Sequence, residues 1–256
     1  MSEISSVLKT FIAYLKRPDL YPELRRKIIK NTLQRKNAFK GKEKTNSWAA
    51  SHAMSQQEAI SKLFGMEMGS FRNEYAEVLK NAGQKQTDCP IKMGGAGALE
   101  LIYYACEFAG ARNVVETGVA YGWSSLAALL SLTKRDGALY SSDMPYLAQD
   151  GDQYVGCIVP DTLRPNWKLF RFADKESLPK IFAENSVFDV IHYDSDKSYN
   201  GRFWAYNELY KHLRSGGVFI SDDIGDNSAY QDFCEKNNLE TMVVEYEGKY
   251  IGLFVK

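Results

Sequence analysis

The 256-residue sequence predicts an α/β protein in which helices cover both faces of a mostly parallel, seven-stranded sheet. Two observations predict this fold. From about residue 95, short apolar runs typical of strands alternate with segments of helical spacing. The chain then closes on two further strands around Glu247-Gly248-Lys249, a turn typical of an antiparallel hairpin.

The first ninety residues carry no strand pattern, so we expect a helical extension (1–90) ahead of the α/β domain (91–256). Apolar residues recur there at helical spacing, and two prolines mark the entry to a second helix: Ile4, Val7, Leu8, Phe11, Ile12 and Leu15, then Pro18 and Pro22. A cap over the active site and a homodimer contact are both compatible with such an extension.

In the α/β domain each expected strand is followed by an expected helix, which makes neighbouring strands parallel. The strands cover 113–117, 138–142, 168–172, 188–193 and 217–221, and the hairpin covers 241–247 and 250–255. The helices cover 98–108, 124–132, 175–183, 203–213 and 229–236.

Composition excludes several classes of protein. Thirty-two basic residues balance thirty-two acidic ones, so we expect no nucleic-acid partner. The four cysteines form no CxxC pair, which argues against a zinc ribbon and fits reduced thiols. Without an apolar stretch of about 18 residues or a secretory signal, the sequence predicts a soluble cytoplasmic protein. One segment, 25–44, has nine basic residues and one glutamate, a local charge of +8 that faces either solvent or an anionic substrate, lipid surface or partner.

The loop after the first parallel strand has the composition of a ligand-binding turn. Gly118 and Gly122 allow the backbone to turn tightly and approach a ligand, and Ser124 or Ser125 can cap the next helix. A glycine-rich turn of purely steric purpose is the alternative. The GxxxG spacing differs from the GxGxxG of dinucleotide-binding loops.

Two further motifs follow later strands, FDVIHYDSDKSY (188–199) and LRSGGVFISDDI (213–224). Together with the glycine loop they resemble the class I S-adenosylmethionine-dependent methyltransferases, which have a Rossmann-like fold. They resemble most the O-methyltransferase branch, of catechol and caffeoyl-CoA type, and a bacterial group with an I-D-x-D-x-S-Y motif. The resemblance covers roughly residues 90–256.

The resemblance implies a binding site for S-adenosylmethionine. Asp143 matches the acid that binds the ribose hydroxyls, and the segment at Asp174 matches the adenine contact, although a helix N-cap is the alternative role for Asp174. A segment at Met93 and Gly94 matches a lid over the cofactor. The remaining implied cofactor residues are Glu116, Thr117, Gly118, Gly122, Ser124, Ala173 and Asp194.

The resemblance also implies a divalent metal held by Asp194, Asp222 and Asp223. Three carboxylates at neighbouring strand ends would repel one another unless a cation neutralises them, and oxygen ligands suit Mg²⁺, Mn²⁺ or Ca²⁺. The alternative is that Asp222 and Asp223 cap a turn and Asp194 only lies near the cofactor.

Lys197 lies three residues after Asp194, the spacing at which the catechol-type enzymes carry their general base. An ammonium beside a metal ion and a sulfonium loses its proton more readily, which would make Lys197 a base for the substrate hydroxyl. An exposed lysine paired with Asp196 is the alternative. His192 is a second candidate base, although its position inside a strand is more typical of a core residue.

These features together predict an O-methyltransferase that acts on a small molecule with two neighbouring oxygens, such as a sugar, a glycosylated natural product or a catechol-like diol. Three other functions stay open: a metal-free methyltransferase, a nicotinamide-dependent oxidoreductase, and a non-catalytic scaffold that docks through residues 25–44.

Overall fold

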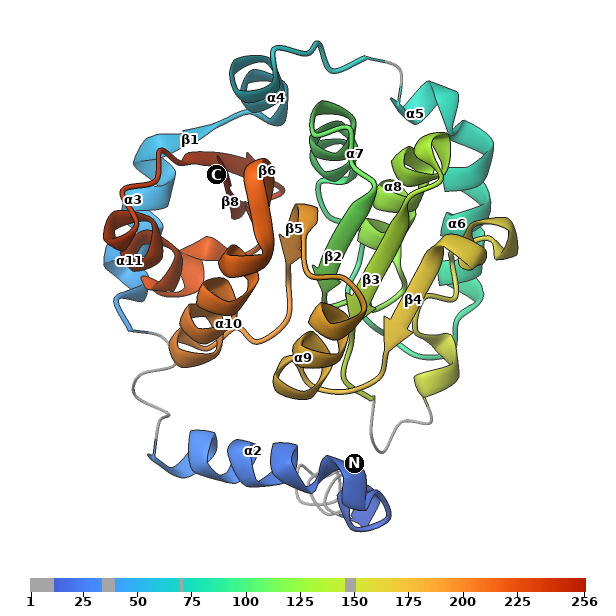
Figure 1. Ribbon diagram of the computed structural model, residues 1–256, viewed down its shortest axis with the longest axis vertical. Coiled ribbons are helices and arrows are strands. Elements are labelled where there is room, and N and C mark those ends of the chain that lie inside the picture. Colours follow the sequence, from blue (N-terminus) through green and yellow to red (C-terminus); the bar gives the residue numbers. More distant parts are fainter. Residues whose placement is uncertain (1–11, 34–39, 70, 146–150) are drawn as a thin grey trace.

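The computed structural model describes residues 12–33, 40–69, 71–145 and 151–256. Its strands form one sheet in the order β1-β7-β8-β6-β5-β2-β3-β4 (Figure 1). The strands are β1 (Ala53–Met54), β2 (Asn113–Thr117), β3 (Ala138–Ser142), β4 (Trp167–Phe170), β5 (Phe188–Tyr193), β6 (Leu213–Ser221), β7 (Met242–Tyr246) and β8 (Lys249–Val255). All neighbours are parallel except β8, which runs antiparallel to β6 and β7.

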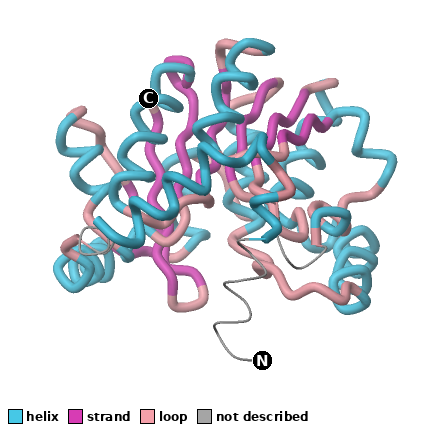
Figure 2. The backbone as a smooth tube through the Cα atoms, turned by 90° about the horizontal axis from the view of Figure 1, so that it is seen from below, coloured by secondary structure: helices cyan, strands magenta, loops and turns pink. Residues whose placement is uncertain are grey.

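Helices cover both faces of this sheet, as the sequence predicts. They are α2 (Tyr21–Leu33), α3 (Lys42–His52), α4 (Gln56–Phe64), α5 (Phe71–Glu74), α6 (Ala76–Asp88), α7 (Leu99–Phe108), α8 (Trp123–Leu132), α9 (Asp174–Glu184), α10 (Tyr199–His212) and α11 (Ala229–Lys236). Figure 2, seen from below, shows helices around the strands. None of the helices within the described ranges is long and apolar enough to cross a membrane.

The sheet separates two apolar cores. One core lies under α4, α7 and α8, and the other under α9, α10 and α11. Successive residues of a central strand alternate between them: Val190 packs in the first and Ile191 in the second. Because both faces are covered, the central strands are mostly apolar, with a few buried polar residues such as Glu116 and His192, and this is why short apolar runs located them.

The C-terminal hairpin is also confirmed. Glu247 and Gly248 connect β7 to β8, and both have positive φ, 50° and 76°. A two-residue turn with two positive φ angles matches the twist of antiparallel strands.

The extension differs from expectation in one respect. Ala53 and Met54 form β1, an eighth strand, which pairs in parallel with Val243 and Val244 at the edge of the sheet. Two residues are too short to produce an alternating pattern, so no sequence signal marked them. The helices predicted from Ile4 to Phe11 lie outside the described residues.

The extension and the α/β domain share their cores. Ala49 of α3 belongs to the core under α10 and α11, whereas Ile60 and Phe64 of α4 belong to the core under α7 and α8. The boundary at residues 90 and 91 therefore divides the chain by sequence character but not by packing.

The order of the strands locates the ligand site. From β2 the chain proceeds to β3 and β4 on one side, then returns to β5 and β6 on the other. In open α/β sheets, ligands bind beyond the carboxyl ends of the strands at such a reversal. Helix α2 lies across this end of the sheet, below the strands in Figure 1.

Candidate active site

A cavity of about 1230 Å³ lies at the carboxyl ends of β2, β3, β5 and β6. A cavity for one small ligand is usually roughly 300–1,000 Å³, so this volume suits a cofactor together with a second substrate. Many of the residues predicted from the sequence line it: Gly94, Gly118, Ser124, Asp143, Ala173, Asp174, His192, Asp194, Lys197, Asp222 and Asp223. Met93, Glu116, Thr117 and Gly122 are not among its lining residues.

The two glycines of the loop after β2 have different roles. Both need positive φ, 84° at Gly118 and 98° at Gly122. A Cβ at Gly118 would collide with the backbone carbonyl of Asp194, whereas a Cβ at Gly122 would lie 2.9 Å from Val159 Cγ2. Gly118 thus packs against the backbone that follows β5 and also lines the cavity, and Gly122 allows close packing of the loop against the segment that contains Val159.

Glu116 and Thr117 support the loop from beneath. Glu116 is 1% exposed, and its Oε2 accepts hydrogen bonds from Ser125 Oγ at 2.5 Å and Ser141 Oγ at 2.8 Å. The carbonyl of Thr117 accepts from the amide of Asp194 at 2.8 Å. Glu116 and Thr117, which the resemblance places at the cofactor, thus support the loop and do not line the cavity. Neither Ser124 nor Ser125 caps α8, since Gly122 is its N-cap residue and no side-chain bond is present there.

Asp143 follows β3 and holds the same loop from the other side. Its Oδ2 accepts hydrogen bonds from the amides of Val119 at 3.1 Å and Ala120 at 2.8 Å. Desolvation raises the pKa of Asp143, although these two amides favour its charged form. Asp143 thus both shapes the loop and faces the cavity.

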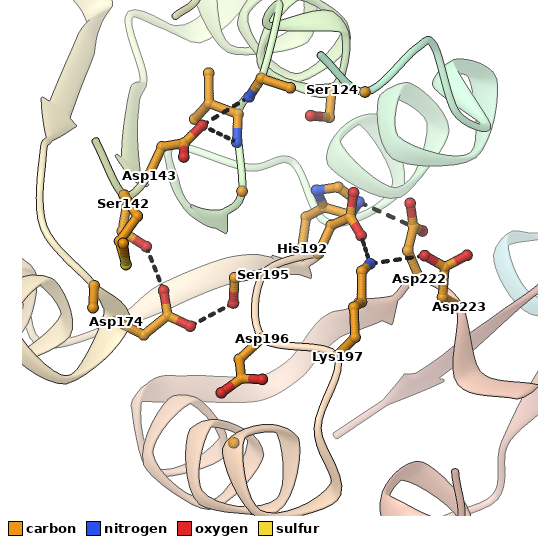
Figure 3. Close-up of a pocket in the computed structure, with 18 of the residues that line it drawn as sticks. Ser124, Ser142, Asp143, Asp174, His192, Ser195, Asp196, Lys197, Asp222 and Asp223 are labelled. Carbon is orange, nitrogen blue, oxygen red and sulfur yellow. Dashed lines mark hydrogen bonds and ion pairs between the residues drawn. The ribbon is translucent and has the colours of Figure 1, made fainter. Parts of the chain in front are cut away.

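Asp174 is held by two serine hydroxyls, Ser142 Oγ at 2.9 Å and Ser195 Oγ. Desolvation raises the pKa of Asp174 to about 6. It is the first residue of α9, whose N-cap is Ala173, so its side chain does not act as the helix cap. Figure 3 shows Asp143 and Asp174 on one side of the cavity.

The segment before α7 is attached to the glycine loop. The amide of Met93 donates to the hydroxyl of Tyr121 at 3.1 Å, and that hydroxyl donates to the carbonyl of Ile91 at 2.8 Å. The Met93 side chain packs against the core, whereas Gly94 to Gly97 line the cavity. The lid predicted at Met93 and Gly94 therefore contacts the cavity through its glycines.

A second group of charged residues lies on the other side of the cavity (Figure 3). Lys197 Nζ forms ion pairs with Asp194 Oδ1 and with Asp223 Oδ2, the latter at 2.8 Å. Lys249 Nζ lies 3.3 Å from the other oxygen of Asp223. Desolvation opposes the charge of Asp223, but the two ammonium groups lower its pKa.

Asp194, Asp222 and Asp223 do not form a ready metal site. In the parts of the chain that the structure describes, no three His, Cys, Asp or Glu residues are arranged to hold a metal ion. The ammonium of Lys197 lies between two of the three carboxylates, and Asp222 Oδ1 faces His192 Nε2 at 3.6 Å. Lys197 and His192 therefore face the three carboxylates that were predicted to bind a metal ion.

The two candidate bases are in unfavourable protonation states for that role. Desolvation lowers the pKa of Lys197, but Asp194 and Asp223 more than offset this and raise it above the ordinary value. His192 is 2% exposed and lies between Asp222 and Glu116; burial opposes its charge, yet these carboxylates raise its pKa to about 10. A general base needs the opposite shift.

The structure adds cavity residues that sequence reasoning missed. From α2 they are Glu23, Arg26, Lys27 and Ile29, and from the C-terminal hairpin Tyr246, Glu247, Lys249 and Ile251. Arg26 donates to Glu176 of α9 at 2.5 Å and to Glu23 at 2.9 Å, which fastens α2 over the cavity. In the sequence, Pro18 and Pro22 marked the entry to this helix, and the basic segment 25–44 includes Arg26 and Lys27, which line the cavity. Neither signal placed α2 over the cavity.

One family model and several solved structures are similar to this chain. Residues 115–224 match the family model of a methyltransferase domain. No curated protein matches the chain in sequence.

Among solved structures, the O-methyltransferase from Bacillus cereus in complex with SAH is similar, with a TM-score of 0.55 and 17% identity over 81% of this chain and 100% of that one. The O-methyltransferase TomG from Streptomyces achromogenes, in complex with SAM, has a TM-score of 0.54 and 17% identity over 79% of this chain and 100% of its own. The SAH-bound Podospora anserina methyltransferase PaMTH1 has a TM-score of 0.54 and 10% identity over 84% of this chain and 94% of its own. These findings confirm the Rossmann-like α/β fold that the sequence predicts, which the chain shares with these methyltransferases, and residues 115–224 are similar to a methyltransferase domain.

Proposed function

We propose that the chain is an S-adenosylmethionine-dependent O-methyltransferase acting on a small molecule. The observation that carries this proposal is one large cavity with two separate polar groups. Asp143 and Asp174 lie on one side, and Lys197, Asp222 and Asp223 lie on the other, where Asp194 pairs with Lys197. A cavity divided in this way fits two ligands, a nucleoside cofactor and a hydroxyl acceptor.

The residues on the cofactor side suit an adenosyl sulfonium. Asp143 Oδ2 is occupied by loop amides, which leaves Oδ1, 4.0 Å from Arg171 Nη1, for a ribose hydroxyl. Asp174 offers a carboxylate to the amino group of adenine. Gly94, Gly95, Gly97 and Gly118 present backbone without side chains to the methionine part.

When bound, S-adenosylmethionine supplies an electrophilic methyl group on a positively charged sulfur. The chain's contribution is to place the acceptor hydroxyl in line with that group and to receive its proton. Lys197 is the proposed proton acceptor and must first lose its own proton, a loss that a neighbouring positive charge favours. Asp194, whose pKa desolvation raises to about 6, is the alternative acceptor.

The finer part of the proposal is a divalent cation and an acceptor with two adjacent oxygens, as in a sugar or catechol diol. The support for a cation is the donor set, three carboxylates that follow β5 and β6 at one cavity wall. Lys197 pairs with two of them, so its ammonium would compete with such a cation.

Calorimetry with S-adenosylhomocysteine, with and without Mg²⁺, tests both parts. Micromolar binding supports the cofactor site, and absence of binding at millimolar ligand favours the scaffold alternative instead. Methyl transfer to catechol that persists in excess EDTA and in Asp222→Ala would show a metal-free enzyme.

A further inference from the structure

The positions of Glu116, His192 and Asp222 follow from the register of three adjacent strands. Glu116 on β2 pairs with His192 on β5, and His192 pairs with Ile220 on β6. Asp222 lies two residues beyond Ile220, so its side chain returns to the same face of the sheet. The imidazole of His192 is therefore flanked by one carboxylate from each side.

The distances confirm this arrangement. His192 Nδ1 lies 3.7 Å from Glu116 Oε1, and Nε2 lies 3.6 Å from Asp222 Oδ1 (Figure 3 shows the second pair). Neither ring nitrogen has a hydrogen-bond partner among the described residues. A buried polar ring without partners is costly, so the two carboxylates are the groups that make its position tenable.

Each carboxylate uses its two oxygens for different contacts. Glu116 Oε2 is taken by Ser125 and Ser141, which leaves Oε1 to face His192. Asp222 Oδ1 faces His192, while a Cβ at Gly97 would lie 3.6 Å from Oδ2, and Gly97 lines the cavity. The ring thus determines which oxygen of Asp222 is presented to the cavity.

We propose that His192 is a positioning residue: anchored by Glu116, its ring holds the Asp222 carboxylate by Oδ1, with Oδ2 directed into the cavity beside Gly97. It acts through Asp222 and takes no proton from the substrate, in contrast to the base role considered from sequence. The inference rests on the proposed methyltransferase function. Through these contacts, Glu116, which supports the glycine loop after β2, is connected to Asp222 on the acceptor side of the cavity.

A double-mutant cycle tests this proposal. His192→Phe, Asp222→Asn and the double variant are compared for methyl transfer from S-adenosylmethionine to catechol and for binding of S-adenosylhomocysteine. We expect His192→Phe to lower kcat/KM for catechol by roughly 10–100-fold, as loss of a residue that orients a site carboxylate does. The affinity for S-adenosylhomocysteine should stay within about 3-fold, and adding His192→Phe to Asp222→Asn should cause no further loss of transfer.

Two control variants separate positioning from folding. Ile191→Val alters the neighbouring residue, which packs on the opposite face, and should leave transfer unchanged. His192→Gln retains one donor for Asp222 and should recover most of what His192→Phe loses; it also serves as the test if His192→Phe does not fold.

Three results would overturn the proposal: wild-type kcat/KM in His192→Phe, losses that multiply with that of Asp222→Asn, or an equal loss of S-adenosylhomocysteine affinity. If the wild-type chain binds S-adenosylhomocysteine but does not methylate catechol, the acceptor part of the proposed function has failed. Urea unfolding of the wild type, the two single variants and the double variant then decides the inference. Non-additive shifts of the urea midpoint support contact between His192 and Asp222, and additive shifts refute it.

Discussion

The backbone of Gly118 lies directly against the carbonyl group of Asp194, so the loop after β2 and the loop after β5 touch where the strand order reverses. This contact joins the glycine loop of the cofactor side to the first acid of the acceptor side. The two halves of the cavity are therefore in direct backbone contact.

Gly118→Ala should destabilise the chain and abolish binding of S-adenosylhomocysteine. The new Cβ would meet backbone that cannot rotate away, and φ of 84° adds strain, so we expect a loss of about 1–3 kcal/mol in the free energy of unfolding. Urea unfolding and calorimetry measure the two effects. Gly65→Ala is the matched control, because Gly65 also has positive φ, 63°, but nothing lies within 4 Å of its Cβ position. Equal losses in both variants would show that strain alone, without the Asp194 contact, explains the effect.

Lys197→Met should lower methyl transfer by roughly 10²–10⁴-fold and leave S-adenosylhomocysteine binding intact, if Lys197 handles the substrate proton. Lys249→Met is the control, because Lys249 also pairs with Asp223 but makes no ion pair with Asp194 among the described residues. A normal rate in Lys197→Met would assign Lys197 the role of counter-ion only.

Asp174→Asn should bind S-adenosylhomocysteine at least about 10-fold more weakly and yet unfold at higher urea concentration at pH 7–8. The folded-state pKa of Asp174 is about 6, above its ordinary value of 3.8, so the neutral acid favours the folded state. That stabilisation is present below pH 3.8 and is lost as pH rises through about 6.

The asparagine variant does not ionise, so its urea midpoint should fall less than that of the wild type between pH 4 and 7. Asp161→Asn, whose side chain is 96% exposed, should follow the wild type. Parallel pH profiles for Asp174→Asn and the wild type would contradict the assigned shift.

Arg26→Gln should accelerate release of S-adenosylhomocysteine several-fold, because the Arg26–Glu176 ion pair fastens α2 over the cavity. The melting temperature should change little, since half-exposed ion pairs contribute about 0–1 kcal/mol. Stopped-flow release from Arg26→Gln and from Arg17→Gln, which breaks the surface pair Arg17–Asp19 and leaves the Arg26–Glu176 pair in place, provides the comparison. Identical release rates would show that α2 does not control exit.

The sheet was predictable because its central strands are buried on both faces and because Glu247-Gly248 is a specific turn. Four acids of the site could also be placed from the sequence, because each follows the carboxyl end of a predicted strand: Asp143, Asp174, Asp194 and Asp222.

Other features could not be read from the chain. The two residues of β1 are too few for a pattern, and the Arg26–Glu176 ion pair that joins α2 to α9 is a long-range contact that no local pattern indicates. The spacing of Lys197 correctly put it beside Asp194, but its second contact with Asp223 depends on how two strand ends meet in space.

The pairing of β1 with β7 has a practical consequence for expressing shortened forms of the protein. A fragment that begins at residue 91 would lose Ala53 and Met54 and expose the outer hydrogen-bonding edge of β7. An exposed strand edge can pair with a strand of another molecule, which leads to aggregation. It would also remove α4 from above Val244 and Ile251. We expect such a truncation to precipitate rather than yield a minimal catalytic unit, so the early helices belong in any version made for crystallisation or assay.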